Sequence, residues 1–152
     1  MDALHTLFER AQAERNLALG SFNQMRSRFD AARAQATQLE AYRADYERRW
    51  SARFAQGAAL QIVRCYQDFS QRLQTAIAQQ GFAVAQAQAA VAQAGDALTA
   101  HEMRVASVKR LIERRTQAER RILERREQKT DDEYATRVAL ARGGNALGGP
   151  GG

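Results

Sequence analysis

The chain has 152 residues, enough for one domain, and a formal net charge of +6 at pH 7. It is rich in Ala, Gln, Glu and Arg and holds a single proline, a composition typical of long helices that bury a narrow seam instead of a thick core. The lone Cys65 excludes an internal disulfide, the charged start is unlike a secretory signal, and no segment is apolar enough to span a bilayer. We therefore expect a cytoplasmic protein.

A heptad stripe begins near the N-terminus. Alternating steps of four and three residues from Leu4 to Trp50 reach an apolar side chain at every position except Arg15 and Arg43. A stripe sustained over nearly seven heptads predicts a coiled-coil helix over about residues 3–54.

A second stripe starts at Val63 and predicts a helix over about residues 61–137. Gly57 is the candidate turn residue in the connection near residues 55–60. Two long helices joined by so short a connection must run antiparallel. The sequence therefore predicts an all-α fold, a long antiparallel two-helix coiled-coil hairpin.

The limits of this hairpin follow from the same stripes. We expect a single domain over residues 1–138, and a disordered tail over the Gly-rich residues 139–152. Because the first helix runs out opposite Ile112, residues 113–137 are expected to project beyond the N-terminus without an intramolecular partner.

The turn also predicts the register. If it centres on Gly57, facing residues have numbers that sum to about 115 or 116. Large side chains then face small ones in successive layers, as a filled core requires. The polar exceptions Arg15 and His101 fall opposite one another. The facing pairs include Phe22 with Ala94, Phe29 with Ala87, Ala18 with Leu98, Ala11 with Val105, and Leu4 with Ile112.

The sequence shows no enzyme site. His5 and His101 are the only histidines, no cysteines pair, no Gly-rich phosphate loop is present, and the carboxylates are scattered along the helices instead of gathered as acid–base pairs. We expect no catalytic residue, no metal site, no cofactor and no small-molecule substrate. The function must then lie in surfaces.

The first candidate surface is basic. Residues 104–129 hold ten Lys or Arg against four Glu, with Arg pairs at 114/115, 120/121 and 125/126. One interpretation is a partner that is acidic, either a nucleic acid or a protein surface. The other is a solvated helix laced with Glu–Arg pairs four residues apart.

The second candidate surface is aromatic. Six of the eleven aromatic residues lie between Tyr42 and Phe69, on the two arms next to the turn. The heptad phase places Tyr46 and Trp50 in the seam, but it places Tyr42 and Phe69 at g positions, on the same flank of an antiparallel pair. They are expected to form an exposed face that a partner could use. The alternative is that these rings only close the tip of the hairpin.

Three segments together resemble one known family. QATQLEAYRADY (35–46), GAALQIVRCYQDFSQRLQTAIAQQ (57–80) and EQKTDDEYATR (127–137) are similar to segments of the flagellar export protein FliJ family, and length and architecture match along essentially the whole chain. The resemblance implies a cytosolic stalk of the type III flagellar export apparatus, peripherally associated with the inner-membrane export apparatus. Its implied partners are the hexameric export ATPase, the linker of the membrane export gate protein FlhA, and the export chaperones.

The resemblance also implies binding residues. Contact with the export gate is carried over onto Gln35, Leu39, Tyr42, Tyr46, Phe69, Leu73, Ala76 and Gln80, as exposed residues of the first two segments. Contact with the ATPase is assigned more loosely to the basic helix, at Arg114, Arg115, Arg120, Arg121, Arg125 and Arg126. Two alternatives stay open: the equivalent stalk of a virulence-type secretion system, and an Arg-rich coiled-coil protein that binds nucleic acid, the less favoured of the two.

Overall fold

The structure of the protein, a computed structural model, describes the backbone of residues 3–147 and the side chains of residues 3–144. That range forms two helices and no strand: α1, Ala3–Ala55, and α2, Leu60–Leu147. The expected all-α helical hairpin is confirmed.

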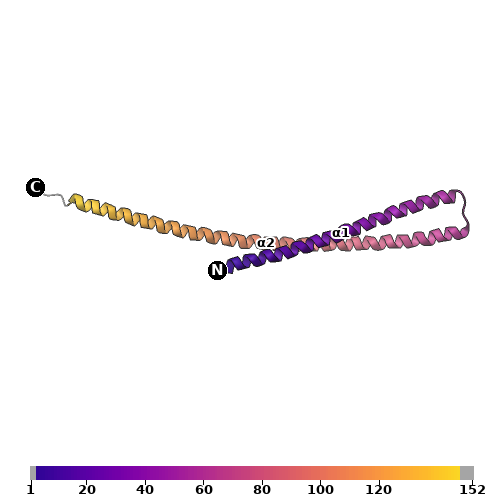
Figure 1. Cartoon of the computed structure of the whole chain (residues 1–152), viewed down its shortest axis with the longest axis horizontal. Helices are drawn as coiled ribbons and strands as arrows, with labels where there is room; N and C mark the ends of the chain where they lie inside the picture. Colours follow the sequence, from indigo (N-terminus) through magenta and orange to yellow (C-terminus); the bar gives the residue numbers. More distant parts are fainter. Residues whose placement is uncertain (1–2, 148–152) are drawn as a thin grey trace. The chain divides into compact units, whose positions relative to one another are not determined.

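The chain divides into two compact units. The hairpin unit is Glu9–Val105, in which α1 and α2 lie side by side and antiparallel (Figure 1). The terminal unit combines residues 3–8 with residues 106–147 of the described chain. The single domain expected over residues 1–138 stays a prediction.

The turn of the hairpin depends on Gly57. Its φ of 90° lies in a region that residues with a Cβ rarely adopt. The sequence analysis predicted this glycine as the turn residue. The backbone N–H of Gly57 donates to the carbonyl of Phe54 at 3.0 Å, which satisfies one of the free carbonyls at the end of α1. At the start of α2 the carbonyl of Ala59 accepts from the N–H groups of Ile62 and Val63, at 3.0 and 3.2 Å.

The heptad stripes are the buried seam. Every position of the first stripe, from Leu4 to Trp50, is buried or half-buried, and so is every position of the second from Val63 to Ile112. Arg15 and Arg43, the two polar residues of the first stripe, are half-buried, and Arg43 forms ion pairs with Glu40 at 2.9 Å and with Glu47 at 4.0 Å. The core is a narrow line of contacts, because two helices alone cannot enclose a thicker one.

The register is the predicted one. The Gln80 side chain donates to the Gln35 side-chain oxygen at 3.2 Å, and the rings of Trp50 and Tyr66 lie 5.7 Å apart, so the paired residue numbers sum to 115 and 116. Phe22 packs against Gly95, where an added Cβ would lie 3.4 Å from the ring. The predicted match of a large ring with a small residue thus holds, shifted by one residue from Ala94.

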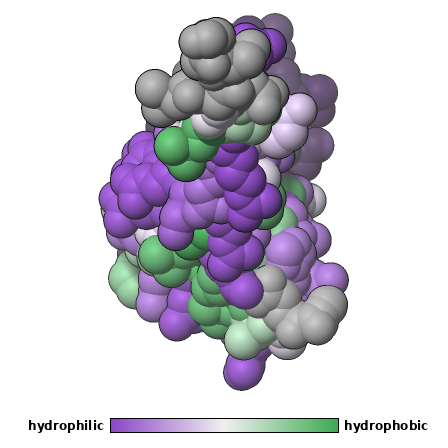
Figure 2. Space-filling model, turned by 90° about the vertical axis from the view of Figure 1, so that its left-hand side faces the viewer, coloured by the Kyte–Doolittle hydropathy of each residue, from purple (hydrophilic) through white to green (hydrophobic). Residues whose placement is uncertain are grey.

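In the terminal unit the seam ends where the sequence placed its end. Val108 is buried and Leu4, Phe8 and Ile112 are half-buried. Every residue from 113 to 137 is exposed, as expected for a helix without an intramolecular partner. In the view of Figure 2 the surface is largely hydrophilic, with hydrophobic residues in separate groups.

The predicted end of the second helix is wrong. The sequence placed it near residue 137 and expected a disordered tail from residue 139, but α2 continues to Leu147. Residues 138–142 are mostly strong helix formers, which extend an existing helix, and each glycine that follows opposes it by only about 1 kcal/mol. The rest of the expected tail, 148–152, lies outside the described residues. No helix within residues 3–147 is both long and apolar enough to cross a membrane.

Candidate functional site

A cluster of six aromatic rings joins the two helices beside the turn. Tyr46 lies at its centre, with ring centroids 4.7 Å from Phe69 and 5.5 Å from Tyr66. Trp50 and Phe54 extend the cluster toward the turn, each in contact with Tyr66. Edge-to-face and offset pairs of this kind stabilise by about 0.5–1.5 kcal/mol each beyond the burial of their area. The rings thus hold the end of the hairpin together where the aliphatic seam is sparse.

Two rings of the cluster also face solvent. Tyr42 is 52% exposed and Phe69 37% exposed, and their rings meet edge to face at a centroid distance of 6.2 Å. The heptad phase predicted this arrangement, with both residues on one flank of the pair. The cluster is therefore not only a cap on the hairpin, because part of its apolar area remains available for contact.

The inner part of the cluster is the better enclosed. Burial raises the pKa of the Tyr46 hydroxyl above its ordinary value of 10.0, and the neighbouring hydroxyls of Tyr42 and Tyr66 raise it further. A hydrogen bond with the Trp50 side chain opposes the change. The upward direction agrees with a phenol that lies among rings, because an apolar environment disfavours the ionised form.

The glutamines at the far end of the predicted gate face lie together. Gln80 donates from its amide nitrogen to the Gln35 side-chain oxygen at 3.2 Å and to the backbone carbonyl of Ala32 at 2.9 Å. Gln35 is exposed and Gln80 half-buried. This bridge fixes the level of α1 against α2 at one end of the face, as the Tyr42–Phe69 contact does at the other.

Not all eight predicted gate residues reach the surface. Leu39, Tyr46 and Ala76 are half-buried, and Leu73 is buried, with 7% of its area exposed. The expectation that these residues are exposed is wrong for Leu73, because its d position points into the seam, where the leucine is enclosed by the facing helix. The exposed members of the set are Gln35, Tyr42 and Phe69.

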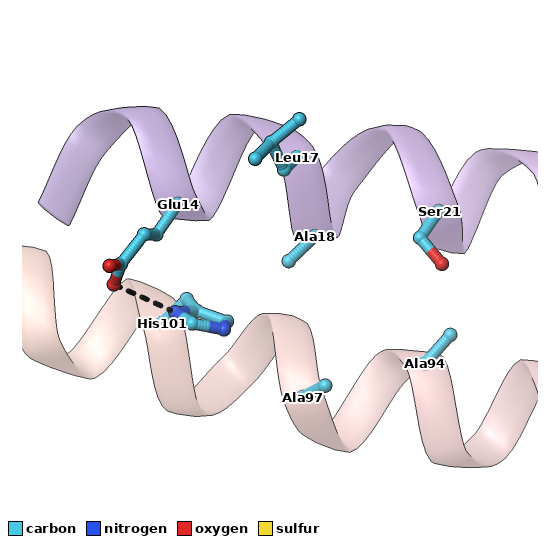
Figure 3. A pocket seen from close by; sticks show the side chains of 7 residues that line it. All are labelled: Glu14, Leu17, Ala18, Ser21, Ala94, Ala97 and His101. Atoms are coloured by element: carbon cyan, nitrogen blue, oxygen red, sulfur yellow. Dashed lines mark ion pairs between the residues drawn. The ribbon is translucent and has the colours of Figure 1, made fainter. Parts of the chain in front are cut away.

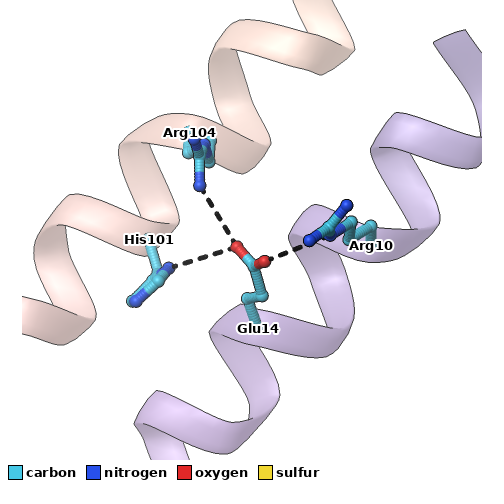
Figure 4. A network of polar contacts seen from close by, with 4 residues as sticks. All are labelled: Arg10, Glu14, His101 and Arg104. Atoms are coloured by element: carbon cyan, nitrogen blue, oxygen red, sulfur yellow. Dashed lines mark hydrogen bonds and ion pairs between the residues drawn. The ribbon is translucent and has the colours of Figure 1, made fainter.

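A polar network that the sequence analysis missed lies elsewhere on the hairpin unit (Figure 4). The Glu14 carboxylate accepts a hydrogen bond from Arg104 of α2 at 3.2 Å and lies 3.5 Å from Arg10 of α1. Nδ1 of His101 is 4.0 Å from the same carboxylate. The sequence analysis predicted Arg15 opposite His101, but the α1 side chain that lies close to His101 is that of Glu14, one position earlier. The Arg15 side chain donates instead to Asn16 at 3.1 Å.

Beside this network the flank is hollowed, because small residues face each other there (Figure 3). Ala18 and Ser21 of α1 lie opposite Ala94 and Ala97 of α2, and exposed Leu17 stands at the rim. Glu14 and His101 close one end of the hollow. The predicted register places these small residues opposite one another, but the sequence analysis did not predict a hollow here.

The predicted ATPase arginines are exposed but do not form one patch. On a helix with about 100° per residue, Arg114, Arg121 and Arg125 share one face, and Arg110 falls on the same line. Arg115 and Arg126 point to another face, where Arg115 forms an ion pair with Glu119 at 3.3 Å. Arg120 lies between the two groups. Among the described residues, no group of His, Cys, Asp and Glu gathers that could hold a metal ion.

Comparison with known families gives one match. The family model of the flagellar FliJ protein matches residues 1–144. The chain belongs to the FliJ family. This membership makes the chain a component of flagellar type III protein export, and it favours the flagellar alternative over the virulence-type one. Neither the curated proteins nor the solved structures gave a match to the chain.

Proposed function

We propose that this FliJ-family chain is a stalk that binds the export ATPase ring through its basic helix and the membrane export gate through the aromatic face beside the turn. In this role it promotes assembly of the ring, connects it to the linker of the gate protein FlhA, and takes part in handling export chaperones. The chain itself hydrolyses nothing. Its place is the cytoplasm, peripherally associated with the inner-membrane export apparatus.

The aromatic face supports the gate half of this proposal. Tyr42 and Phe69 come from different helices, touch each other and yet remain exposed. Exposed aromatic pairs on an otherwise polar surface are favourable anchors for a partner, because they bury a large area at little cost in side-chain entropy. The Gln35–Gln80 bridge adds polar groups at the rim of the same face. Leu73 is buried in the seam, so we assign it a role in packing the helices instead of a direct contact with the gate.

The basic helix supports the ATPase half. Arg110, Arg114, Arg121 and Arg125 lie along one line of α2, and no ion pair among the described residues neutralises them. Guanidinium groups in such a line fit an acidic protein surface, because each can bind a carboxylate through two parallel hydrogen bonds. We assign the ATPase contact to this line first, and to Arg115, Arg120 and Arg126 second.

The single observation that carries the proposal is the exposed ring pair of Tyr42 and Phe69 at the hairpin end. Its test is the binding of the purified chain to the cytoplasmic linker of the gate protein. Replacing both rings, Tyr42→Ala with Phe69→Ala, should weaken binding at least tenfold while helicity is retained. A matched control is Phe82→Ala, since Phe82 is also exposed on α2 but lies outside this face. Equal loss in the control, or no loss in the double variant, would remove the gate assignment.

A further inference from the structure

The turn between α1 and α2 is unusually apolar for a connection that faces solvent. Exposed connections are mostly built from Gly, Asn, Asp, Ser and Pro, which favour turns and bind water. Here Gly57 is followed by Ala58, Ala59 and Leu60, and all four residues are exposed. Leu60 leaves 67% of its area open to solvent. We name residues 57–60 the apolar tip, and they lie at the end of the hairpin unit where α1 meets α2 (Figure 1).

Arginines lie just behind the apolar tip on both helices. Arg53 belongs to the last turn of α1. Arg64 lies one turn into α2, about 6 Å along the helix from its first residue. Both are exposed, and Arg48 and Arg49 follow farther from the tip on α1. Residues 48–67 contain no Asp or Glu, so this end of the hairpin carries four positive charges with no acidic residue among them.

The arginines nearest the tip keep their full charge. Asp45 lies 3.8 Å from Arg48 and 3.0 Å from Arg49, so it partly neutralises these two within α1. The guanidinium of Arg53 instead lies over the Trp50 ring, 5.2 Å from the ring centroid. An arginine held over an aromatic ring stays charged, and it can still donate its N–H groups to an anion in its own plane.

We propose that the apolar tip enters the surface of an anionic lipid bilayer, with Arg53 and Arg64 donating hydrogen bonds to lipid phosphates. From the tip inward the hairpin presents Leu60 first and the arginines behind it. A bilayer presents the matching order, acyl chains beneath a layer of phosphates. The long arginine side chains reach the phosphates while the leucine is covered. The turn has backbone N–H and C=O groups that acyl chains cannot satisfy, so the entry is shallow.

The arrangement favours a lipid surface over other acidic partners. A nucleic acid offers phosphates, but it has no apolar layer beneath them that would cover Leu60. An acidic protein would need a hollow shaped to receive the tip, whereas lipids rearrange around the narrow end of two helices. Tyr42 and Phe69 take no part in this contact. It therefore does not rest on the proposed function, and loss of lipid binding can be told apart from loss of gate binding.

The test is co-sedimentation of the full chain with vesicles made of equal parts of phosphatidylglycerol and phosphatidylcholine, at physiological salt. Wild type should bind these vesicles, and should bind vesicles of phosphatidylcholine alone much more weakly. Leu60→Asp, and separately Arg53→Glu with Arg64→Glu, should each weaken binding about tenfold or more, because each places negative charge beside the lipid phosphates. A wild-type chain that does not bind the anionic vesicles overturns the proposal.

Matched controls separate the tip from the charge of the whole chain. Arg26→Glu with Arg33→Glu makes the same change in net charge away from the tip, and both of these arginines are exposed and lie over aromatic rings. Leu17→Asp changes another leucine of α1 that is 77% exposed. Both controls should bind within about threefold of wild type. Equal losses in the tip variants and their controls, all of them helical by circular dichroism, overturn the proposal.

A fluorescent dye tests which part of the chain enters the bilayer. In a Cys65→Ser background, an environment-sensitive dye is attached at Ala58→Cys or at Gln117→Cys, the second on the basic part of α2. On vesicle binding the dye at position 58 should shift its emission to shorter wavelength, and lipids brominated in their acyl chains should quench it. The dye at position 117 should remain unquenched. Quenching at position 117 but not at position 58 would assign the lipid contact to the basic helix and overturn the proposal.

Discussion

Tyr42 of α1 and Phe69 of α2 touch edge to face at 6.2 Å while both remain open to solvent. A contact that served stability alone would be better enclosed, as that of half-buried Tyr46 with half-buried Tyr66 is. The same cluster therefore has two roles: its inner rings join the helices, and its outer rings present an apolar face. Substitutions that separate stability from binding test this division.

Leu73 and Tyr42 should differ sharply in their effect on stability. Leu73→Ala removes a buried side chain from the seam and should lower the free energy of unfolding by about 2–4 kcal/mol. Tyr42→Ala removes a half-solvated ring and should cost about 1 kcal/mol or less. Urea denaturation followed by circular dichroism measures both. Similar losses in the two variants would show that Tyr42 is part of the core.

The register of α1 against α2 was predictable because it depends on the volumes of the facing side chains as well as on the heptad spacing. The heptad spacing alone leaves the register of the two helices uncertain by seven residues. Gly57 identified the turn, and the register that follows from this turn places aromatic rings opposite small residues. Phe22 packs against Gly95 by the same rule, because a Cβ added to Gly95 would lie only 3.4 Å from the ring. The network around Glu14 escaped prediction, because a g-position acid reads as a solvated charge until its neighbours across the seam are placed.

The burial of Leu73 and the end of α2 were also misjudged, for different reasons. Leu73 was carried over as a binding residue from a family resemblance, although its own d position already placed it in the seam. The end of α2 was predicted too early because the Gly-rich segment from residue 143 was read as a disordered tail. Residues 139–142 are strong helix formers, and α2 continues through the first glycines to Leu147.

The register can be tested by cross-linking. In a Cys65→Ser background, Ala18→Cys with Leu98→Cys should form a disulfide readily on mild oxidation, because these residues face each other across the seam. The comparison pair, Ala18→Cys with Val91→Cys, is one heptad out of register and should remain reduced. Mobility on a non-reducing gel reports the result. Preferential oxidation of the comparison pair would contradict the turn at Gly57.

Two glycines should respond in opposite directions to the same substitution. Gly57→Ala forces a Cβ onto a backbone with φ of 90° and should lower the free energy of unfolding by about 1–2 kcal/mol. Gly81→Ala adds a Cβ in open space within α2 and should raise it by about 0.5–1 kcal/mol. Thermal melts of the two variants give the signs. A stabilising Gly57→Ala would mean that the turn adopts another backbone conformation.

The raised pKa of Tyr46 predicts a loss of stability in strong alkali. Its hydroxyl ionises near pH 10.0 in the unfolded chain and at a higher pH in the folded chain, so the folded state binds its proton more tightly. The stabilisation is fully present below pH 10 and is lost as the pH rises through the folded pKa. Unfolding free energies measured from pH 8 to 11 should therefore fall less steeply for Tyr46→Phe than for wild type. Equal slopes would place the phenol in solvent.

We propose that one chain binds the export ATPase and the gate through separate surfaces. A co-sedimentation assay measures whether the chain bridges the ATPase hexamer and the gate linker. Wild type should yield the three-component complex. Tyr42→Ala with Phe69→Ala should keep the ATPase and lose the linker, and Arg121→Glu with Arg125→Glu should keep the linker and lose the ATPase. Absence of the three-component complex with wild type, or loss of both partners in either variant while it stays helical, would contradict the account.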